Sequence, residues 1–238
     1  KQKSVTMFAS AIRRAAQGGR RLRHSNMNPH LLQAEYAVRG PLVLRAGEIE
    51  KELKAGSKDW DFSSIVYCNI GNPQQLGQKP ITFGREVLAL VSQPSLIETA
   101  PKELFTAAAR DRAEEILSDL SYKSTGQYTH SLGLSIVRQH VKEYIEKRDG
   151  GIAADAERIG LSDGASPSVK NILSALIRND KDAILTPVPQ YPLYSASIAL
   201  FGGSIAPYYL DFDNSWGVSI EELRKSVKNG REGGLNMR

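Results

Sequence analysis

The sequence has little that would cross-link the chain or hold it in a membrane. Cys68 is the only cysteine among 238 residues, so no intrachain disulfide can form and a metal site with two cysteine ligands is excluded. No apolar run approaches the roughly 20 residues that a membrane-spanning helix needs. These absences predict a protein of a reducing compartment without membrane partners, and the length allows one large domain or two smaller ones.

Acidic residues are absent from residues 1–34, although the whole chain has 26. The chain carries a formal net charge of +5, and because this first segment carries seven positive charges, the rest has a net charge of about −2. A protein that binds nucleic-acid phosphates keeps its positive charge on the folded part. The distribution therefore argues against a nucleic-acid partner. The seven basic residues are Lys1, Lys3, Arg13, Arg14, Arg20, Arg21 and Arg23.

The basic segment also has the composition of a targeting signal. Between Met7 and Ser25 it combines arginine with serine and alanine, and it places Phe8, Ile12 and Ala16 on one helical stripe. This composition is typical of mitochondrial transit peptides. We therefore predict that residues 1–34 are a presequence outside the fold and that the protein is located in the mitochondrial matrix. A disordered basic tail, or a start at Met27 that gives a cytoplasmic form, is the alternative.

Apolar spacing predicts the secondary structure of the first half of the chain. Apolar residues at helical spacing predict helices over 101–120 and 132–147, and a shorter helix over 48–53. The segment 64–70 has the pattern of a strand, and the turn-rich segment 71–80 that follows is predicted to be a loop.

The pattern changes after residue 158. Strands are predicted over 158–162, 183–187 and 204–210, with one helix that begins at Pro167 and another over 195–200. Strands that alternate with helices through short connections favour a parallel sheet flanked by helices. The last nine residues, GREGGLNMR, are predicted to be a loop.

One turn in this alternating region consists of small residues. Ser166 is a good helix N-cap and Pro167 suits the first helical position, so a well-capped helix without a ligand is the simplest interpretation. However, Gly164 and Ala165 leave their backbone amides unshielded, and the turn follows a predicted parallel strand, where open α/β sheets bind ligands. A helix N-terminus with free N–H groups binds anions. The sequence therefore predicts a phosphate site.

The common nucleotide-binding motifs are missing. The sequence has no G-x-x-x-x-G-K-[ST] loop and no G-x-G-x-x-G motif in the right place, which argues against nucleoside triphosphate chemistry. Tyr191 lies in the loop after the strand 183–187, between two prolines. Its ring could lie flat against a planar cofactor whose phosphate is bound at Ser166. Ordinary packing of Tyr191 is the alternative.

Four segments carry a family resemblance. They resemble the amino-terminal half of the eukaryotic alanine aminotransferases, which are pyridoxal-phosphate enzymes, and the resemblance runs from about Asn28 to the last residue. The double glycine of RDGG and the turn GASPSVK distinguish this family from the aspartate and aromatic aminotransferases. The segments are IGNPQQLGQKPITFGREVLAL, STGQYTHSLGLSIVRQHVKEYIEKRDGG, SDGASPSVKNIL and TPVPQYPLYSASIAL.

The resemblance implies an α/β fold. It implies an aspartate-aminotransferase-like large domain with a mainly parallel sheet, incomplete in this chain, and part of a small α/β domain. Residues 35–90 are then the N-terminal arm and a small-domain segment. Residues 91–238 are then the amino-terminal half of the large cofactor-binding domain.

The resemblance also implies pyridoxal 5'-phosphate as the cofactor. Gly164, Ala165 and Ser166 fall on the turn that binds its phosphate, in agreement with the physical argument above. Tyr191 falls on the aromatic residue that stacks on the pyridine ring.

Two further residues gain roles from the resemblance alone. Tyr128 aligns with the tyrosine that reaches the phosphate in the partner subunit, which implies a homodimer. Gly71 aligns with the glycine whose backbone meets the substrate carboxylate, and a simple strand-ending turn is the alternative interpretation. The implied reaction moves an amino group between L-alanine and 2-oxoglutarate.

The groups that perform this reaction are not expected within the chain. Transamination needs a lysine that holds the cofactor and moves a proton, an aspartate facing the pyridine nitrogen, and an arginine for the substrate carboxylate. In the family these residues follow an Asn-Pro-Gly-Asn-Pro-Thr-Gly loop, which the sequence lacks. We therefore predict an inactive fragment with no catalytic residue. The alternatives are another aminotransferase or an aminocyclopropane-carboxylate synthase, or a non-catalytic product that binds cofactor or dimerises.

Other polar residues gain no chemical role. Lys170 lies one turn beyond the predicted phosphate site and is expected to point into solvent. His130 and His140 have no partner at metal-ligand spacing, so we predict no metal site. Asp211 and Asp213 fit a turn between a strand and a helix.

Overall fold

Two compact bodies make up the chain. The computed structural model describes residues 23–36, 38 and 40–238, and the predicted stripe of Phe8, Ile12 and Ala16 lies outside them. The sheet body contains the described residues up to Ser64 together with Val169–Arg238, and the helical body contains Ile65–Ser168. The predicted division at residues 34 and 90 stays a prediction.

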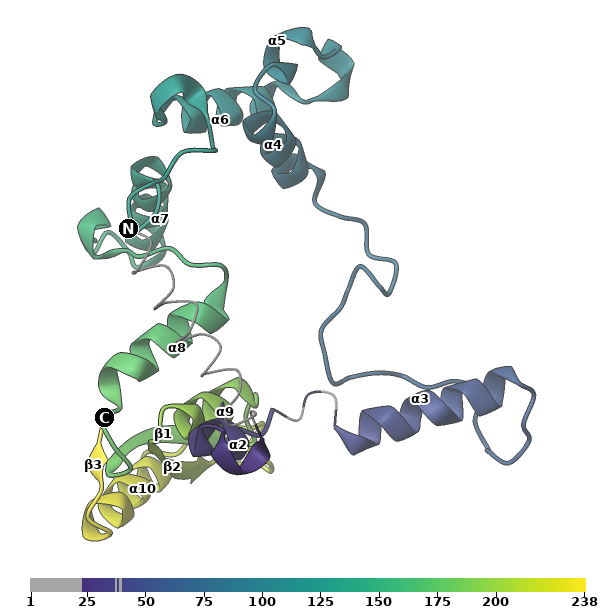
Figure 1. Cartoon of the computed structure of the whole chain (residues 1–238), viewed down its shortest axis with the longest axis vertical. Coiled ribbons are helices and arrows are strands. Elements are labelled where there is room, and N and C mark those ends of the chain that lie inside the picture. The colour runs from purple at the N-terminus through teal and green to yellow at the C-terminus, as the bar shows by residue number, and fades with distance from the viewer. Residues whose placement is uncertain (1–22, 37, 39) are drawn as a thin grey trace, which may run out of the picture. The chain divides into compact units, whose positions relative to one another are not determined.

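A small parallel sheet organises the sheet body (Figure 1). Its order is β2-β1-β3, and β1 pairs parallel with both neighbours. The register with β2 runs from Ala183↔Ser204 to Val188↔Tyr209. The predicted alternation of helix and parallel strand is therefore confirmed for β1 and β2. The strands are β1 Asp182–Val188, β2 Ser204–Tyr209 and β3 Asn236–Met237.

The helices of the sheet body follow local capping signals. In α2, the side chain of Asn28 accepts a hydrogen bond from the His30 amide, and the helix starts with a proline. In α10, Ser219 caps the Glu222 amide in the same way. These caps account for where the two helices begin. The described helices are η1 His24–Asn26, α2 Pro29–Gln33, α3 Pro41–Lys54, α9 Leu193–Leu200, α10 Ile220–Glu232 and, from Val169 onward, α8 Ala165–Leu176, whose first residues belong to the helical body.

Apolar residues from α8 and α9 form the core of the sheet body. Leu173, Ile177 and Ile198 are buried together, with Val169, Ile184 and Phe201 packed around them. Burying one such side chain fully stabilises a fold by about 1.5–3 kcal/mol. This cluster holds the later turns of α8 against β1 and α9.

A charge network closes the amino-terminal end of β1. The carboxylate of Asp182 is fully buried and accepts hydrogen bonds from the Arg178 side chain (3.0 and 3.2 Å), the Arg178 amide (3.0 Å) and Arg238 Nε (2.9 Å). The Arg178 side chain, then its amide, hold the pKa of Asp182 well below its usual value. The carboxylate is therefore buried in its charged form and fully hydrogen-bonded.

The helical body contains helices and loops but no strand among residues 65–168. Its core forms where α4 packs on α6, and Ala109 and Ala113 on α6 are fully buried. Alanine at these two positions, one turn apart, allows the helices to approach closely. The core also holds Val87, Leu90, Val91, Leu117 and Leu120. The elements are α4 Thr82–Ser92, α5 Leu96–Thr99, η3 Lys102–Leu104, α6 Ala107–Ser118, η4 Ser121–Lys123, α7 Ser135–Arg148 and η5 Ala156–Arg158.

Polar contacts fix the ends of these helices. Thr106 caps α6 by accepting from the Ala109 amide, and its own hydroxyl donates to Glu86 of α4 at 2.7 Å. Arg110 donates to backbone carbonyls on both sides of the turn after α5, including those of Ala100 (3.2 Å) and Pro101 (2.9 Å). Guanidinium groups suit this role because they present several donors in one plane.

Several predicted elements differ from the observed ones. The segments 64–70 and 158–162 form no strand, and in the latter only the Leu161 amide bonds a distant backbone group, Leu132 O at 2.9 Å. Without a paired neighbour, an alternating pattern cannot become a strand. The last residues, predicted to be a loop, include β3, and α4 was not predicted at all. The helices α3, α6 and α7 were predicted with different limits.

Candidate functional site

A turn of small residues precedes α8. Gly164 has a φ of +91°, which glycine adopts without strain, and nothing lies within 4 Å of the position that its side chain would occupy. The Ser162 hydroxyl donates to Gly164 O at 2.8 Å and contacts the Ser168 hydroxyl. The Ser162 hydroxyl therefore stabilises the turn, and the missing side-chain position of Gly164 stays open.

The helix begins two residues earlier than predicted. It starts at Ala165, so Ser166 is the second helical residue rather than the N-cap, and Pro167 is the third rather than the first. A helix leaves the N–H groups of its first turn without internal partners. Among the described residues, the amides of Ala165 and Ser166 have no hydrogen-bond partner. With the helix beginning at Ala165, these two donors lie at its N-terminus, next to the Ser166 hydroxyl.

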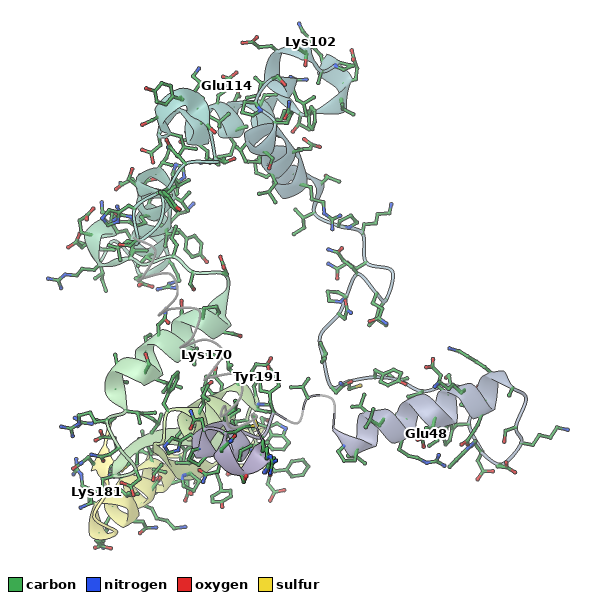
Figure 2. All side chains as sticks on the ribbon, viewed as in Figure 1. Glu48, Lys102, Glu114, Lys170, Lys181 and Tyr191 are labelled. Carbon is green, nitrogen blue, oxygen red and sulfur yellow. The ribbon has the colours of Figure 1, made fainter. Side chains whose placement is uncertain are left out.

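This turn has the chemistry of an anion site. Two free amides, the positive end of a helix dipole and a hydroxyl suit a phosphate. Asp163 opposes this charge, but it is exposed, and solvent screens exposed charges. Lys170 on α8, marked in Figure 2, is exposed as predicted. The residues therefore fit the phosphate group of a cofactor.

Tyr191 lies in the loop between β1 and α9 of the sheet body (Figure 2). Its side chain is 49% exposed, and its backbone carbonyl accepts from the Tyr194 amide at 3.2 Å, so the loop is tied to the start of α9. Its ring meets the ring of Tyr36 edge to face, with centroids 5.9 Å apart and planes at 75°. The side-chain oxygen of Gln190, next to it, is buried without a partner among the described residues.

Tyr36 is the residue that sequence reasoning missed. Its hydroxyl contacts the hydroxyl of Tyr191 although the two lie 155 residues apart. No local pattern in the sequence indicates a contact over this separation. The only signal that could have suggested Tyr36 is that the hydroxyl of Tyr191, in an exposed loop, needs a hydrogen-bond partner.

Tyr128 lies in the loop before α7 of the helical body. Its side chain is fully exposed and makes no hydrogen bond with any other described residue. It borders a cavity of about 310 Å³ that Gln127, His130 and Arg138 also line. Its predicted role at the phosphate of a partner subunit stays a prediction.

Gly71 has an open environment. It is exposed, and no atom lies within 4 Å of its missing side-chain position. The strand that was to end at Gly71 does not form, so the strand-ending interpretation is not supported. Its backbone is accessible, and its predicted contact with a substrate carboxylate stays a prediction.

The predicted site residues fall into separate groups. Gly164, Ala165 and Ser166 form one continuous turn, and no hydrogen bond within the helical body joins Tyr128 or Gly71 to it. Tyr191 belongs to the sheet body. The structure therefore does not join the predicted residues into one site.

No group of three or more His, Cys, Asp or Glu side chains in residues 23–36, 38 and 40–238 is arranged to hold a metal ion. In the same residues, no helix has the length and apolar character needed to cross a membrane.

Comparison with known proteins identifies the family to which the chain is similar. Residues 98–237 match the family model for aminotransferase class I and II. Alanine aminotransferase 2 of Panicum miliaceum is 49% identical over 90% of this chain and 44% of its own length. The mitochondrial alanine aminotransferase 1 of Arabidopsis thaliana is 47% identical over 89% of this chain and 39% of its own length. The chain thus spans less than half the length of these relatives.

A solved structure shows the same fold. The alanine aminotransferase of Pyrococcus furiosus superposes with a TM-score of 0.58 and 21% identity, covering 84% of this chain and 40% of that one. The likeness confirms the predicted aspartate-aminotransferase-like α/β fold, with the short parallel sheet as part of its large domain. The relatives also confirm the resemblance to alanine aminotransferases. The family match covers more than half of the sequence, and the chain therefore belongs to the aminotransferases of class I and II.

Proposed function

We propose that this chain is the amino-terminal part of an alanine aminotransferase that moves an amino group between L-alanine and 2-oxoglutarate. The similarity to the alanine aminotransferase of Panicum miliaceum over 90% of the chain supports this specific activity. The observation that carries the proposal is the turn at Gly164, where two free amides and a hydroxyl follow a glycine whose missing side-chain position has no atom within 4 Å.

The chain's own residues would bind and orient the cofactor. The amides of Ala165 and Ser166 and the Ser166 hydroxyl would hold the phosphate of pyridoxal 5'-phosphate. Tyr191 would lie against the pyridine ring, because aromatic rings stack favourably in offset geometry. The bound cofactor would store the amino group between the two half-reactions. The catalytic lysine would lie in the part of the relatives that this chain does not span.

Two further roles belong to the same proposal. Tyr128 would reach the phosphate bound by the partner subunit of a homodimer, which its full exposure permits. The backbone of Gly71 would hold the substrate carboxylate, which its open surroundings permit. Gel filtration with light scattering on the protein from the complete coding sequence tests the dimer. A monomer that binds cofactor normally would contradict the role of Tyr128.

Cofactor binding tests the site directly. In the protein from the complete coding sequence, Ser166→Ala should weaken binding of pyridoxal 5'-phosphate about tenfold or more, because a hydrogen bond to a charged group contributes about 1.5–3 kcal/mol. Ser174→Ala removes a hydroxyl from the same helix, bonded only to Asn171 O, and should leave the affinity unchanged. Equal affinity of the Ser166→Ala variant and wild type would place the phosphate elsewhere.

A half-reaction assay tests the substrate. The cofactor-loaded protein is mixed with alanine, aspartate or tyrosine, and the cofactor absorbance reports transfer of the amino group. Alanine should react fastest. Faster transfer from aspartate or tyrosine would favour another aminotransferase of the same fold.

The location follows from the basic segment. We infer the mitochondrial matrix because residues 1–34 have the composition of a presequence, and the Arabidopsis relative is named mitochondrial. Fluorescence microscopy of residues 1–34 fused to a reporter should show import. Replacing Arg13, Arg14, Arg20 and Arg21 with glutamine should leave the fusion in the cytoplasm, and unchanged import would contradict this inference.

A further inference from the structure

The segment before α3 contacts the loop that carries Tyr191. The hydroxyls of Tyr36 and Tyr191 are in hydrogen-bonding contact, and the two rings meet edge to face at 5.9 Å. Both contacts occur within the sheet body. Tyr36 therefore touches Tyr191 at two points, through its hydroxyl and through its ring.

The position of Tyr36 is supported by the packing of the residues that precede it, Pro29–Gln33. The short helix α2 lies against α9 (Figure 1). The ring of His30 lies directly over Gly202, where a side chain would come within 2.9 Å of it. Gly202 also has a φ of +73°, so glycine suits this position for two reasons. The segment is thus seated on α9, three residues before Tyr36.

The contact leaves much of Tyr191 accessible. About half of the Tyr191 side chain is exposed, and its hydroxyl has Tyr36 as its partner. An exposed tyrosine in a loop rotates freely about its first side-chain bond unless neighbours restrict it. Tyr36 restricts the Tyr191 ring through the hydroxyl contact and the ring contact, and about half of Tyr191 stays exposed.

We propose that Tyr36 is a positioning residue that fixes the ring of Tyr191 for a planar ligand. This inference rests on the proposed function, in which Tyr191 stacks on the cofactor ring. Tyr36 itself touches no reacting atom in this account. A preoriented ring loses less conformational entropy on binding than a mobile one, so its removal should weaken stacking rather than abolish binding.

The first experiment tests the contact without any cofactor. The hydrogen bond to Tyr191 raises the pKa of Tyr36 above its usual value. NMR titration of the complete protein with ring-labelled tyrosine measures this pKa, and the Tyr36 resonance is assigned through Tyr36→Phe. The midpoint of the Tyr36 titration should lie at a higher pH than the usual tyrosine value. Tyr191→Phe should return it to the usual range, and Tyr144→Phe in α7 should not. A Tyr36 resonance that is unaffected by Tyr191→Phe would overturn the proposal.

The second experiment tests the positioning role. Tyr36→Phe should weaken binding of pyridoxal 5'-phosphate by about two- to tenfold, as expected for one net hydrogen bond. It should also change the circular dichroism of the bound cofactor, which depends on the orientation of neighbouring rings. Tyr144→Phe is the matched control for loss of one phenol hydroxyl and should change neither quantity.

The outcomes separate the two proposals. If wild type binds no cofactor, the proposed function fails, and the NMR titration still decides whether Tyr36 restrains Tyr191. If wild type binds cofactor and Tyr36→Phe changes neither affinity nor dichroism, the positioning role is overturned and the proposed function stands.

Discussion

The sheet body and the helical body differ in how their structure follows from local sequence. In the sheet body, β1 has a backbone partner on each side and forms a strand. In the helical body, the alternating segment 158–162 bonds a distant backbone group only through Leu161 and forms no strand. The comparison shows that an apolar pattern becomes a strand only where neighbours accept its hydrogen bonds. Helices satisfy these bonds internally, so they form in both bodies.

The largest expected effect concerns the core of the helical body. Leu90 is fully buried between α4 and α6. Leu90→Ala should lower the free energy of unfolding by about 2–5 kcal/mol, since it removes buried apolar surface and leaves a cavity. Hydrogen exchange should show the loss at the amides of α4 and α6, with β1 amides as the reference. Unchanged protection of α4 would contradict the role of Leu90.

The next effect concerns the charge network of the sheet body and depends on pH. Because the pKa of Asp182 is lowered in the folded protein, its stabilising contribution is fully present above the unfolded value of about 4 and is lost progressively as the pH falls from there through the lower folded value. Asp182→Asn should therefore lower the melting temperature by several degrees at pH 7 and by less at pH 3. Thermal denaturation at the two pH values measures both shifts. Equal shifts would show that the carboxylate charge contributes nothing.

A smaller effect concerns the cap of α6. Thr106→Ala removes the side chain that caps the Ala109 amide and donates to Glu86. It should lower the free energy of unfolding by about 1 kcal/mol, as for other N-cap substitutions. Thr106→Ser retains the hydroxyl and should recover most of this loss in urea denaturation. If serine is no better than alanine, the hydroxyl is not the cause.

The smallest effect concerns Lys170, which is exposed on α8. Lys170→Ala should change the free energy of unfolding by less than about 0.5 kcal/mol, as expected for surface positions. Cofactor affinity of the complete protein should also stay within about twofold. A large loss of affinity would assign Lys170 to the phosphate site and revise the site described above.

Sequence reasoning predicted the parts of the fold that depend on near neighbours. Helical spacing located α6 and α7, and the succession of short elements located β1, α9 and β2. The limits were less accurate, since α8 begins at Ala165 rather than Pro167. The strand β3 was missed because its two residues gain their structure from pairing with β1, more than 50 residues earlier. A pairing over this separation leaves no trace in a local pattern.

The candidate site was predictable to the same extent. The small residues at 164–166 indicate exposed amides from their chemistry alone, and the structure places these amides in one turn. The family resemblance, rather than any physical signal, supplied Tyr128 and Gly71. Tyr36 was not predictable, because its significance arises only from its contact with Tyr191.

The packing of α10 against β3 has one further consequence. Gly230 is buried, and a side chain at this position would come within 2.5 Å of the Met237 sulfur. Oxidation of that thioether adds a polar oxygen to a side chain that fits closely against bare backbone. The edge formed by β3 should accordingly be the part of the sheet that peroxide loosens first, while the pairing of β1 with β2 persists.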